Sequence, residues 1–310
     1  MTFTTNIKEE LTEINANPIE AISELAAFLR FHAKFSQNTI EVLIENPKIA
    51  RRIYKFIKGI YGVNIIVATR TQKRFRLSQI HILKIKEKYK FILESLNIEY
   101  DGKKILPKDY LLESDEEKKA FLKGIFLSCG SISDPNKGAY HMEFISKTKK
   151  EALLIQELLL YFNVEAKILK RGTRFMIYTK NAEGISEFLK LFGAVNNLFY
   201  FEDIRIYRDH KNMVNRLNNC EVANQEKIIQ TGIKQLEEIK YLTDNNLLDL
   251  LDEKLKLIID YRTKYPEESL KELAEIISME TEKNISKSGV NHAFIKMREL
   301  IKKHKKKTEE

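Results

Sequence analysis

The sequence predicts an α+β protein in which two similar αβ halves are followed by an all-helical domain. Two observations support this fold class. The order helix, strand, helix, hairpin, helix occurs twice, at a spacing of about a hundred residues. Strand-like patterns then end after Phe201, and only helical patterns follow. A duplication of this kind predicts two halves that pack against each other with pseudo-symmetry.

The first half is expected to span about residues 1–100. Pro47 favours the first turn of a helix, and Gly62 favours its end. The predicted elements are a helix over 19–34, a strand over 39–45, a helix over 47–61, two strand-like runs over 63–70 and 75–85, and a helix over 87–96.

The second half is expected to span residues 108–202, after a loop around Pro107. Ser114 and Glu117 have the spacing of a capping box, and Gly130 ends the helix that they begin. The predicted elements are a helix over 115–128, a strand over 140–146, a helix over 147–162, a hairpin of strands over 164–170 and 174–179, and a helix over 182–192.

The remaining chain is predicted to be helical, with a polar connecting helix in residues 203–230 and a small domain over 231–305. Pro266 interrupts the chain before the last two helices. The predicted helices cover 203–224, 225–241, 247–265, 267–277 and 286–303.

Composition narrows the classes of function. The chain has 53 Lys and Arg against 44 Asp and Glu, a formal net charge of +9, which favours polyanionic partners such as nucleic acid. No uncharged apolar run is long enough to cross a membrane, and the N-terminus has acidic residues where a signal peptide is apolar. We therefore expect no membrane insertion and a cytoplasmic, nucleoid-associated protein. Cys129 and Cys220 are the only cysteines, and both are expected to be reduced thiols.

The last two predicted helices have the pattern of a helix-turn-helix. A short amphipathic helix is followed by a polar connection over 279–283 and a second helix with a wide apolar stripe. The first turn of that second helix, Ser286 to Gly289, contains nothing to bury. Recognition helices insert such a turn into the DNA major groove while later turns pack on the domain. The alternative is a capping helix with a solvated basic face.

The second helix supplies the first set of predicted DNA contacts. Ser286 is expected to cap it, so that free backbone N–H groups can meet a phosphate. Asn291 can bond adenine bidentately, and Lys287 can reach guanine acceptors. Eight Lys and Arg against three Glu give residues 286–310 a local net charge of +5. The predicted contacts are Ser286, Lys287, Ser288, Asn291, His292 and Lys296.

The connecting helix supplies the second set. Arg208, Asn212, Asn215 and Asn219 share one helical face, and Lys211 and Arg216 flank it. Asparagine is a poor residue in a helix interior because its amide competes with the backbone. Two interpretations remain open, a clamp bonded to a neighbouring domain and a contact with nucleic acid. For the second interpretation the predicted DNA contacts are Arg208, Lys211, Asn212, Asn215 and Arg216.

Several segments resemble the WhiA family, bacterial regulators linked to sporulation and cell division. They are "FTTNIKEEL" near the start, "VNRLNNCEVAN", "SLKELAEII" and "ISKSGVNHAFIKMREL", and the resemblance covers nearly the whole chain. It implies a degenerate domain of the LAGLIDADG homing-endonuclease type followed by a helix-turn-helix. It also implies a role in cell division and chromosome segregation or in transcription regulation. The implied partners are double-stranded DNA and a sigma factor or another transcription or division protein.

The resemblance also tests for nuclease chemistry. In "FLKGIFLSCGSI" the position of the metal-binding acid falls on Cys129, and in "ELAAFLRFHAKFS" it falls on His32. Paired carboxylates hold Mg²⁺ for phosphodiester cleavage, and a thiol and an imidazole are poor ligands for that ion. We therefore expect no enzymatic activity, no metal and no cofactor. The alternatives are a metal-dependent endonuclease that uses other acids, such as Asp134 or Glu143, and an adaptor that binds a protein partner.

Overall fold

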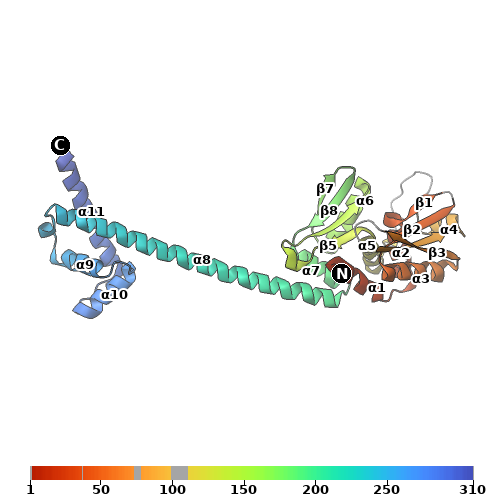
Figure 1. The fold of residues 1–310 in the computed structure, drawn as a ribbon, viewed down its shortest axis with the longest axis horizontal. Coiled ribbons are helices and arrows are strands. Elements are labelled where there is room, and N and C mark those ends of the chain that lie inside the picture. Colours follow the sequence, from red (N-terminus) through yellow and green to blue (C-terminus); the bar gives the residue numbers. More distant parts are fainter. Residues whose placement is uncertain (1, 37, 73–77, 99–110, 310) are drawn as a thin grey trace. The chain divides into compact units, whose positions relative to one another are not determined.

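The computed structural model describes residues 2–36, 38–72, 78–98 and 111–309. The chain divides into two compact units, Met1–Arg208 and Asp209–Glu310, here called the αβ unit and the helical unit (Figure 1). The boundary expected near Pro107, and residues 75–77 of a predicted strand, lie outside the described residues. Each unit is described by itself below.

The first half of the αβ unit contains one four-stranded antiparallel sheet with the strand order β1-β2-β4-β3. Asn46 caps α3 at a proline, and Gly62 ends it in the left-handed conformation, as the sequence indicated. The elements are α1 Phe3–Glu13, α2 Pro18–His32, β1 Lys34–Ser36, β2 Thr39–Ile44, α3 Pro47–Tyr61, β3 Ile65–Gln72, β4 Ser78–Ile85 and α4 Tyr89–Ser95.

The second half repeats the plan, with the strand order β5-β6-β8-β7. The capping box of Ser114 and Glu117 is present at the start of α5. The elements are α5 Asp115–Cys129, β5 Gly130–Ile132, the 3₁₀ helix η2 Pro135–Lys137, β6 Met142–Ser146, α6 Lys149–Tyr161, β7 Lys167–Arg171, β8 Arg174–Thr179 and α7 Ala182–Leu191. The shared strand order confirms the predicted duplication; the three-residue strands β1 and β5 were not predicted.

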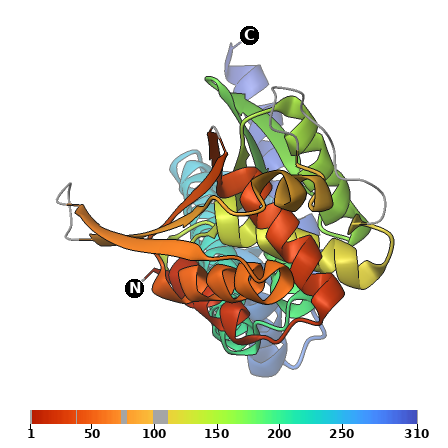
Figure 2. The same cartoon turned by 90° about the vertical axis from the view of Figure 1, so that its right-hand side faces the viewer.

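Helices α2 and α5, which open the two repeated plans, lie side by side at the centre of the αβ unit (Figure 2). A Cβ atom at Gly124 would stand 2.3 Å from the carbonyl oxygen of Glu24, so only glycine permits this separation of the two backbones. Leu25 and Phe28 from α2 and Phe121 and Phe126 from α5 are fully buried. The close approach brings the C-terminal ends of both helices, His32 and Cys129, into one region of the unit.

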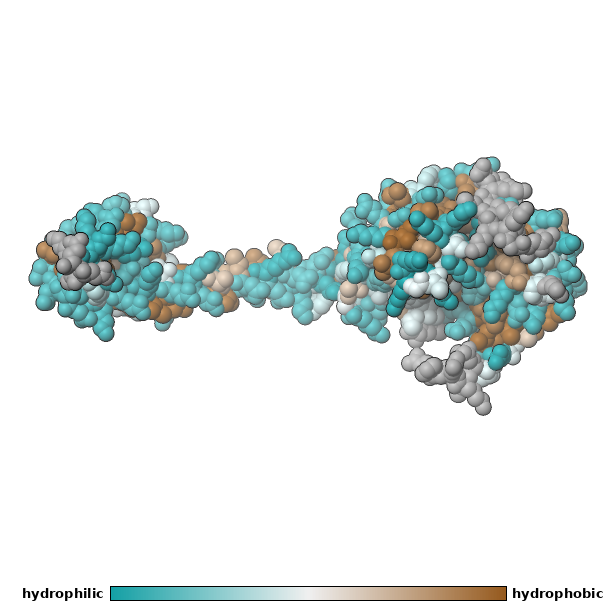
Figure 3. All heavy atoms as spheres, turned by 90° about the horizontal axis from the view of Figure 1, so that it is seen from above, coloured by the Kyte–Doolittle hydropathy of each residue, from teal (hydrophilic) through white to brown (hydrophobic). Residues whose placement is uncertain are grey.

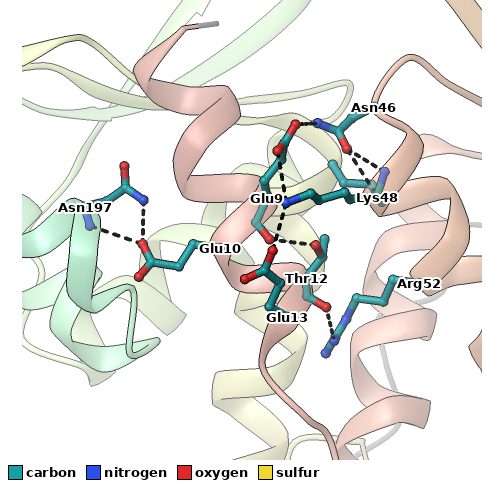
Figure 4. A network of polar contacts seen from close by, with 9 residues as sticks. Glu9, Glu10, Thr12, Glu13, Asn46, Lys48, Arg52 and Asn197 are labelled. Atoms are coloured by element: carbon teal, nitrogen blue, oxygen red, sulfur yellow. Dashed lines mark hydrogen bonds and ion pairs between the residues drawn. The ribbon is translucent and has the colours of Figure 1, made fainter.

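Helix α1 ties the two halves together, and the sequence analysis did not predict it. Its apolar residues Phe3, Ile7 and Leu11 are buried in the shared core. Its polar side contacts both halves (Figure 4): Glu10 accepts hydrogen bonds from the backbone N–H groups of Asn196 and Asn197, at 2.8 and 3.1 Å.

The other carboxylates of α1 face α3 of the first half. Glu9 accepts from Asn46 at 3.0 Å, and the Lys48 ammonium lies 3.3 Å from Glu9 and 2.8 Å from Glu13 (Figure 4). Because the two halves are bridged by one short helix, residues of α1 can reach the ends of both central helices.

The helical unit has its own core, formed by α9, α10, α11 and the last turns of α8. The elements are α8 Val195–Asp244, the 3₁₀ helix η3 Leu248–Leu250, α9 Glu253–Lys264, α10 Leu270–Thr281 and α11 Lys287–Glu309. Leu242, Ile258, Leu273, Phe294 and Met297 are fully buried there. None of the described helices is both long and apolar enough to cross a membrane.

The predicted break between helices 203–224 and 225–241 is wrong, because α8 is continuous from Val195 to Asp244. Asparagine disfavours helix interiors by only about 0.7 kcal/mol per residue, and neither proline nor glycine occurs at Asn224 or Gln225 to stop the helix.

Candidate nucleic-acid interface

The start of α11 presents polar groups to solvent from a rigid base. Ser286 caps the helix, and its Oγ accepts a hydrogen bond from the N–H of Gly289 at 3.2 Å. The first buried residue of α11 is Val290, and Phe294 and Met297 continue the buried stripe. The predicted contacts Ser286, Lys287, Ser288, Asn291 and His292 are all exposed. The structure therefore brings these five side chains together on one solvent-facing helix start.

The turn between α10 and α11 is held by one serine. The N–H of Ile285 donates to Ser278 Oγ at 3.1 Å, and the Ser278 hydroxyl donates to the carbonyl of Ala274 at 2.8 Å. Glu282 ends α10 in the left-handed conformation, with φ 53°. Because these bonds fix the turn, the exposed side chains of α11 are positioned before any partner binds.

Basic residues farther along α11 contact the helical unit itself. Lys296, the sixth predicted contact, is exposed, and its Nζ lies 4.0 Å from a carboxylate oxygen of Asp252 at the start of α9. Arg298 donates from Nε to the carbonyl of Phe294 at 3.1 Å and lies 3.9 Å from Glu238. Lys296 and Arg298 thus lie near carboxylates of the helical unit, whereas Lys287 in the first turn of α11 is exposed.

The predicted contacts on α8 fall into two groups. Lys211, Asn212, Asn215 and Arg216 are exposed, and the face of α8 seen in Figure 3 is mostly hydrophilic. Arg208 instead belongs to the αβ unit, where it donates to the carbonyl of Pro135 at 2.9 Å and lies over the Tyr140 ring at 4.8 Å. Arg208 therefore acts as a clamp within that unit, and its contact with DNA stays a prediction.

The α8 group lies about three helical turns from the start of α11. Lys227 of α8 lines one pocket with Lys287 of α11, and Arg216 precedes Lys227 by 11 residues. Along a straight helix this separation is about 16 Å. One DNA duplex can contact both groups if it extends along α8 by about half a helical turn.

The ends of α2 and α5 hold neutral side chains where the resemblance placed metal-binding acids. His32 donates its Nε2–H to the carbonyl of Leu43 at 2.6 Å, and burial lowers its pKa, so the imidazole is uncharged at neutral pH. Burial raises the pKa of the Cys129 thiol to about 11. A neutral thiol and an imidazole whose Nε2 already donates are poor ligands for Mg²⁺.

Lys8 of α1 adds a cation to the same place, and sequence reasoning missed it. Its ammonium donates to the carbonyl of Leu127 at 3.1 Å and lies 5.5 Å from the Phe126 ring centroid. Burial lowers the pKa of Lys8 to about 8, so the group is still largely charged at neutral pH. The contact joins residues 119 positions apart, which no local pattern signals. An ammonium here opposes binding of a second cation.

The two acids considered as alternative metal ligands have other contacts. Asp134 caps η2 and accepts from the N–H of Asn136 at 3.0 Å. Glu143 accepts from Ser131 Oγ at 3.2 Å and lies 3.1 Å from His141 Nε2. Within the described ranges, no three His, Cys, Asp or Glu residues gather where they could hold a metal ion.

Comparison with protein families gives three matches along the chain. Residues 18–99 match the WhiA N-terminal LAGLIDADG-like domain, residues 118–211 match the WhiA LAGLIDADG-like domain, and residues 214–301 match the WhiA C-terminal HTH domain. These ranges fall on the first half, the second half and the helical unit described above.

Curated relatives match over nearly the full length. The probable cell division protein WhiA of Oceanobacillus iheyensis is 38% identical over 313 residues, covering 99% of this chain and 98% of the relative. The protein of the same name from Staphylococcus aureus strain JH9 is 37% identical over 308 residues, covering 98% and 97%.

Two solved structures share the fold. Full-length WhiA from Thermatoga maritima aligns with a TM-score of 0.57 and 23% identity, covering 98% of this chain and 99% of that one. The N-terminal LAGLIDADG domain of WhiA aligns with a TM-score of 0.51 and 22% identity, covering 62% and 90%.

Proposed function

This chain belongs to the WhiA family, and we propose that it is a sequence-specific DNA-binding protein without enzymatic activity that acts in cell division. The role in cell division comes from the names of the full-length relatives. The observation that supports DNA binding most directly is the start of α11, where Lys287, Ser288 and Asn291 are exposed while Val290 and Phe294 anchor the helix.

In this proposal α11 enters the major groove of double-stranded DNA with its first two turns. Asn291 bonds an adenine edge and Lys287 reaches guanine acceptors, while Ser288 and His292 contact neighbouring groups. The capped start of the helix faces a phosphate through its free N–H groups. The fixed turn at Ser278 limits the entropy that binding must remove.

The absence of cleavage is supported by the chemistry at the ends of α2 and α5. Metal-dependent hydrolysis of a phosphodiester needs a site that attracts Mg²⁺ or Mn²⁺. The αβ unit instead has a neutral imidazole at His32, a protonated thiol at Cys129 and an ammonium at Lys8. We therefore assign the αβ unit a binding role in place of a catalytic one.

The exposed face of α8 is proposed to add contacts to the DNA backbone through Lys211 and Arg216, beside Asn212 and Asn215. Replacing Lys211 and Arg216 with alanine should reduce the slope of log affinity against log salt by roughly 1.8, since each neutralised phosphate contributes about 0.9. The ranking of DNA sites should not change. An unchanged salt slope would remove α8 from the interface.

The αβ unit also has a surface that suits a protein partner, such as a sigma factor or another transcription or division protein. Ile66 and Val67 on β3, Ile145 on β6 and Leu169 on β7 are exposed apolar residues on the two sheets. Apolar side chains on exposed strands favour protein contacts over contacts with a phosphate backbone. Crosslinking in cells from positions 66 and 169 tests this role.

The experiment that tests the proposed function is genome-wide footprinting with the full chain. Discrete protected sites are expected, and their positions separate a role in transcription, with sites at promoters, from a role in chromosome segregation, with sites clustered on the chromosome. The protein should lie on the nucleoid in the cytoplasm. The same preparation incubated with plasmid DNA and Mg²⁺ or Mn²⁺ should produce no nicks. Nicking that disappears on Asp134→Asn or Glu143→Gln would instead support an endonuclease.

A further inference from the structure

The helical unit contains a pocket of about 450 Å³ whose lining is strongly basic. Lys227 of α8, Lys271 in the first turn of α10 and Lys287 in the first turn of α11 line it, together with Arg262 of α9. Glu268 is the one acid among its lining residues. Four cations against one carboxylate give the pocket a net positive charge.

Arg262 is the buried cation of this pocket: burial lowers the pKa of its guanidinium, and the nearby Glu268 carboxylate opposes that shift only in part. The side chain is 1% exposed, and Nη1 donates to the carbonyls of Tyr265, Pro266 and Glu268 at 3.2, 3.4 and 2.7 Å. Its Nε has no hydrogen-bond partner among the described residues. A buried cation whose charge is only partly balanced is unfavourable, and a nearby anion would lower its free energy.

The backbone around the pocket has the same polarity. Ser269 caps α10 and Ser286 caps α11, and the positive ends of both helix dipoles lie beside Lys271 and Lys287. The three lysines are exposed, so they can close over a bound group from the solvent side. Lys271 lies 3.7 Å from Glu275, an exposed pair that contributes little and can exchange for a stronger anion.

Given the proposed function, on which this assignment rests, we infer that the pocket binds a phosphate group of the DNA backbone. A phosphate accepts hydrogen bonds on several oxygens, which matches a set of lysines above a buried guanidinium. Lys287 lines the pocket and is also one of the proposed base contacts of α11. The bound phosphate would therefore lie next to the bases that α11 contacts. The pocket opens to solvent between the three exposed lysines, so a phosphate can enter it while it remains part of a DNA strand. The pocket thereby sets the register of the recognition helix on the duplex.

The test uses the full chain and its footprinted DNA site. Lys227→Ala/Lys271→Ala removes two lysines that no base contact requires, and Lys234→Ala/Lys240→Ala is the matched control, because it removes the same charge from exposed positions of α8 outside the pocket. The slope of log affinity against log salt should fall by about 0.9 in the pocket variant beyond any change in the control. Lys227→Arg/Lys271→Arg should keep the wild-type slope.

A second measurement identifies the phosphate. Neutral methylphosphonate replaces each backbone phosphate of the site in turn. One position should weaken binding of the wild type and of the control more than that of the pocket variant, because the variant has lost two of the four cations that line the pocket. If every position affects the pocket variant and the wild type equally, the assignment is wrong while specific DNA binding stands.

Free phosphate is the other source of the same group. If the pocket binds only the DNA backbone, inorganic phosphate at constant ionic strength should raise the thermal midpoints of the wild type and of the pocket variant equally. Stabilisation of the wild type alone, with an unchanged DNA salt slope, would assign the pocket to a small anion and overturn the DNA contact. Absence of any specific footprint for the wild type would contradict the proposed function itself.

Discussion

Each unit buries an arginine, and the two units balance its charge in different ways. In the αβ unit Arg52, 8% exposed, donates to both oxygens of Glu24 at 2.6 and 2.8 Å, and Lys123 lies 2.8 Å from the same carboxylate. In the helical unit Arg262 donates to backbone carbonyls and lies 5.9 Å from the Phe294 ring centroid, and its Nε has no partner among the described residues. The first unit bonds its arginine directly to a carboxylate, whereas the second leaves Arg262 in a pocket with a net positive charge.

The two units also differ in how the polar groups at their helix ends are bonded. The ends compared are the C-terminal ends of α2 and α5 and the start of α11. At the ends of α2 and α5 the polar groups of His32 and Lys8 are bonded to carbonyls of the unit itself. At the start of α11, Lys287 and Asn291 are exposed. A polar group that is satisfied internally has little to offer a ligand. Under the proposed function, this difference favours DNA contacts from the helical unit over contacts from the ends of α2 and α5.

The largest expected effect tests the internal balance of the αβ unit. Glu24→Ala leaves Arg52 and Lys123 buried without a carboxylate, and it should lower the free energy of unfolding by about 3–5 kcal/mol. Urea denaturation followed by hydrogen exchange in α2 and α5 measures this loss. Glu41→Ala, which breaks an exposed pair with Lys84 at 3.8 Å, is the control and should cost below about 1 kcal/mol. Equal losses in the two variants would show that the buried cluster is not what distinguishes this unit.

The next effect concerns Lys8 and Cys129, whose pKa shifts act in opposite directions. The pKa of Lys8 falls from 10.5 to about 8 on folding, so between these pH values the unfolded state binds more protons and stability rises with pH, by about 3 kcal/mol in total. The pKa of Cys129 rises from 9.0 to about 11, so the folded state keeps a proton that the unfolded state loses and stability falls by about 3 kcal/mol.

Single variants separate the two contributions. Cys129→Ala retains Lys8, so its free energy of unfolding should rise as the pH increases from 8 to 11. Lys8→Met retains Cys129, so its free energy of unfolding should fall over the same range. The wild type should lie between them. Urea denaturation of the three proteins across this pH range measures the differences in their free energies of unfolding. Groups that titrate in all three proteins contribute equally and do not affect these differences. Parallel pH profiles would mean that Lys8 and Cys129 are not buried together at the helix ends.

Local signals explain which parts of this molecule the sequence predicted. The capping box of Ser114 and Glu117 and the stop at Gly62 depend on neighbouring residues, and both are present. The duplicated order of elements was also confirmed by the two sheets. Helix α1 was missed although Phe3, Ile7 and Leu11 have helical spacing, because a short helix at a chain end has a weak pattern.

Contacts between distant residues explain what the sequence could not give. Lys8 reaches Leu127, and Arg262 meets Lys227 across the pocket only after α8 and α9 have packed. The start of α11 could be predicted because exposure there follows from one helical period. The break expected at Asn224 was wrong because α8 continues through it, with no proline or glycine at that point to stop the helix.

The third effect tests the open side of the comparison. Asn291→Ala should weaken binding to the specific site by about 1–3 kcal/mol and relax the preference at one base pair, since the bidentate bond to adenine is lost. Folding should not change, because Asn291 is exposed. Binding is measured against a library of single-base variants of the footprinted site. Lys302→Ala is the control: a lysine near the end of α11 can touch only phosphate, so it should weaken all sites alike. An unchanged ranking with Asn291→Ala would exclude this residue from base contact.

The smallest effect separates the two roles of Ser286, which caps α11 and is also a predicted DNA contact. Ser286→Ala removes the acceptor for the N–H of Gly289 and should cost about 1 kcal/mol of unfolding free energy in the helical unit. Ser286→Asp restores a cap, so its stability should return to the wild-type value, but its carboxylate should repel the DNA backbone and weaken binding at low salt. Thermal melting and DNA titration of both variants decide between the roles. If Ser286→Asp binds DNA like the wild type, the start of α11 faces away from the phosphates. The DNA backbone would then contact other basic residues of the helical unit.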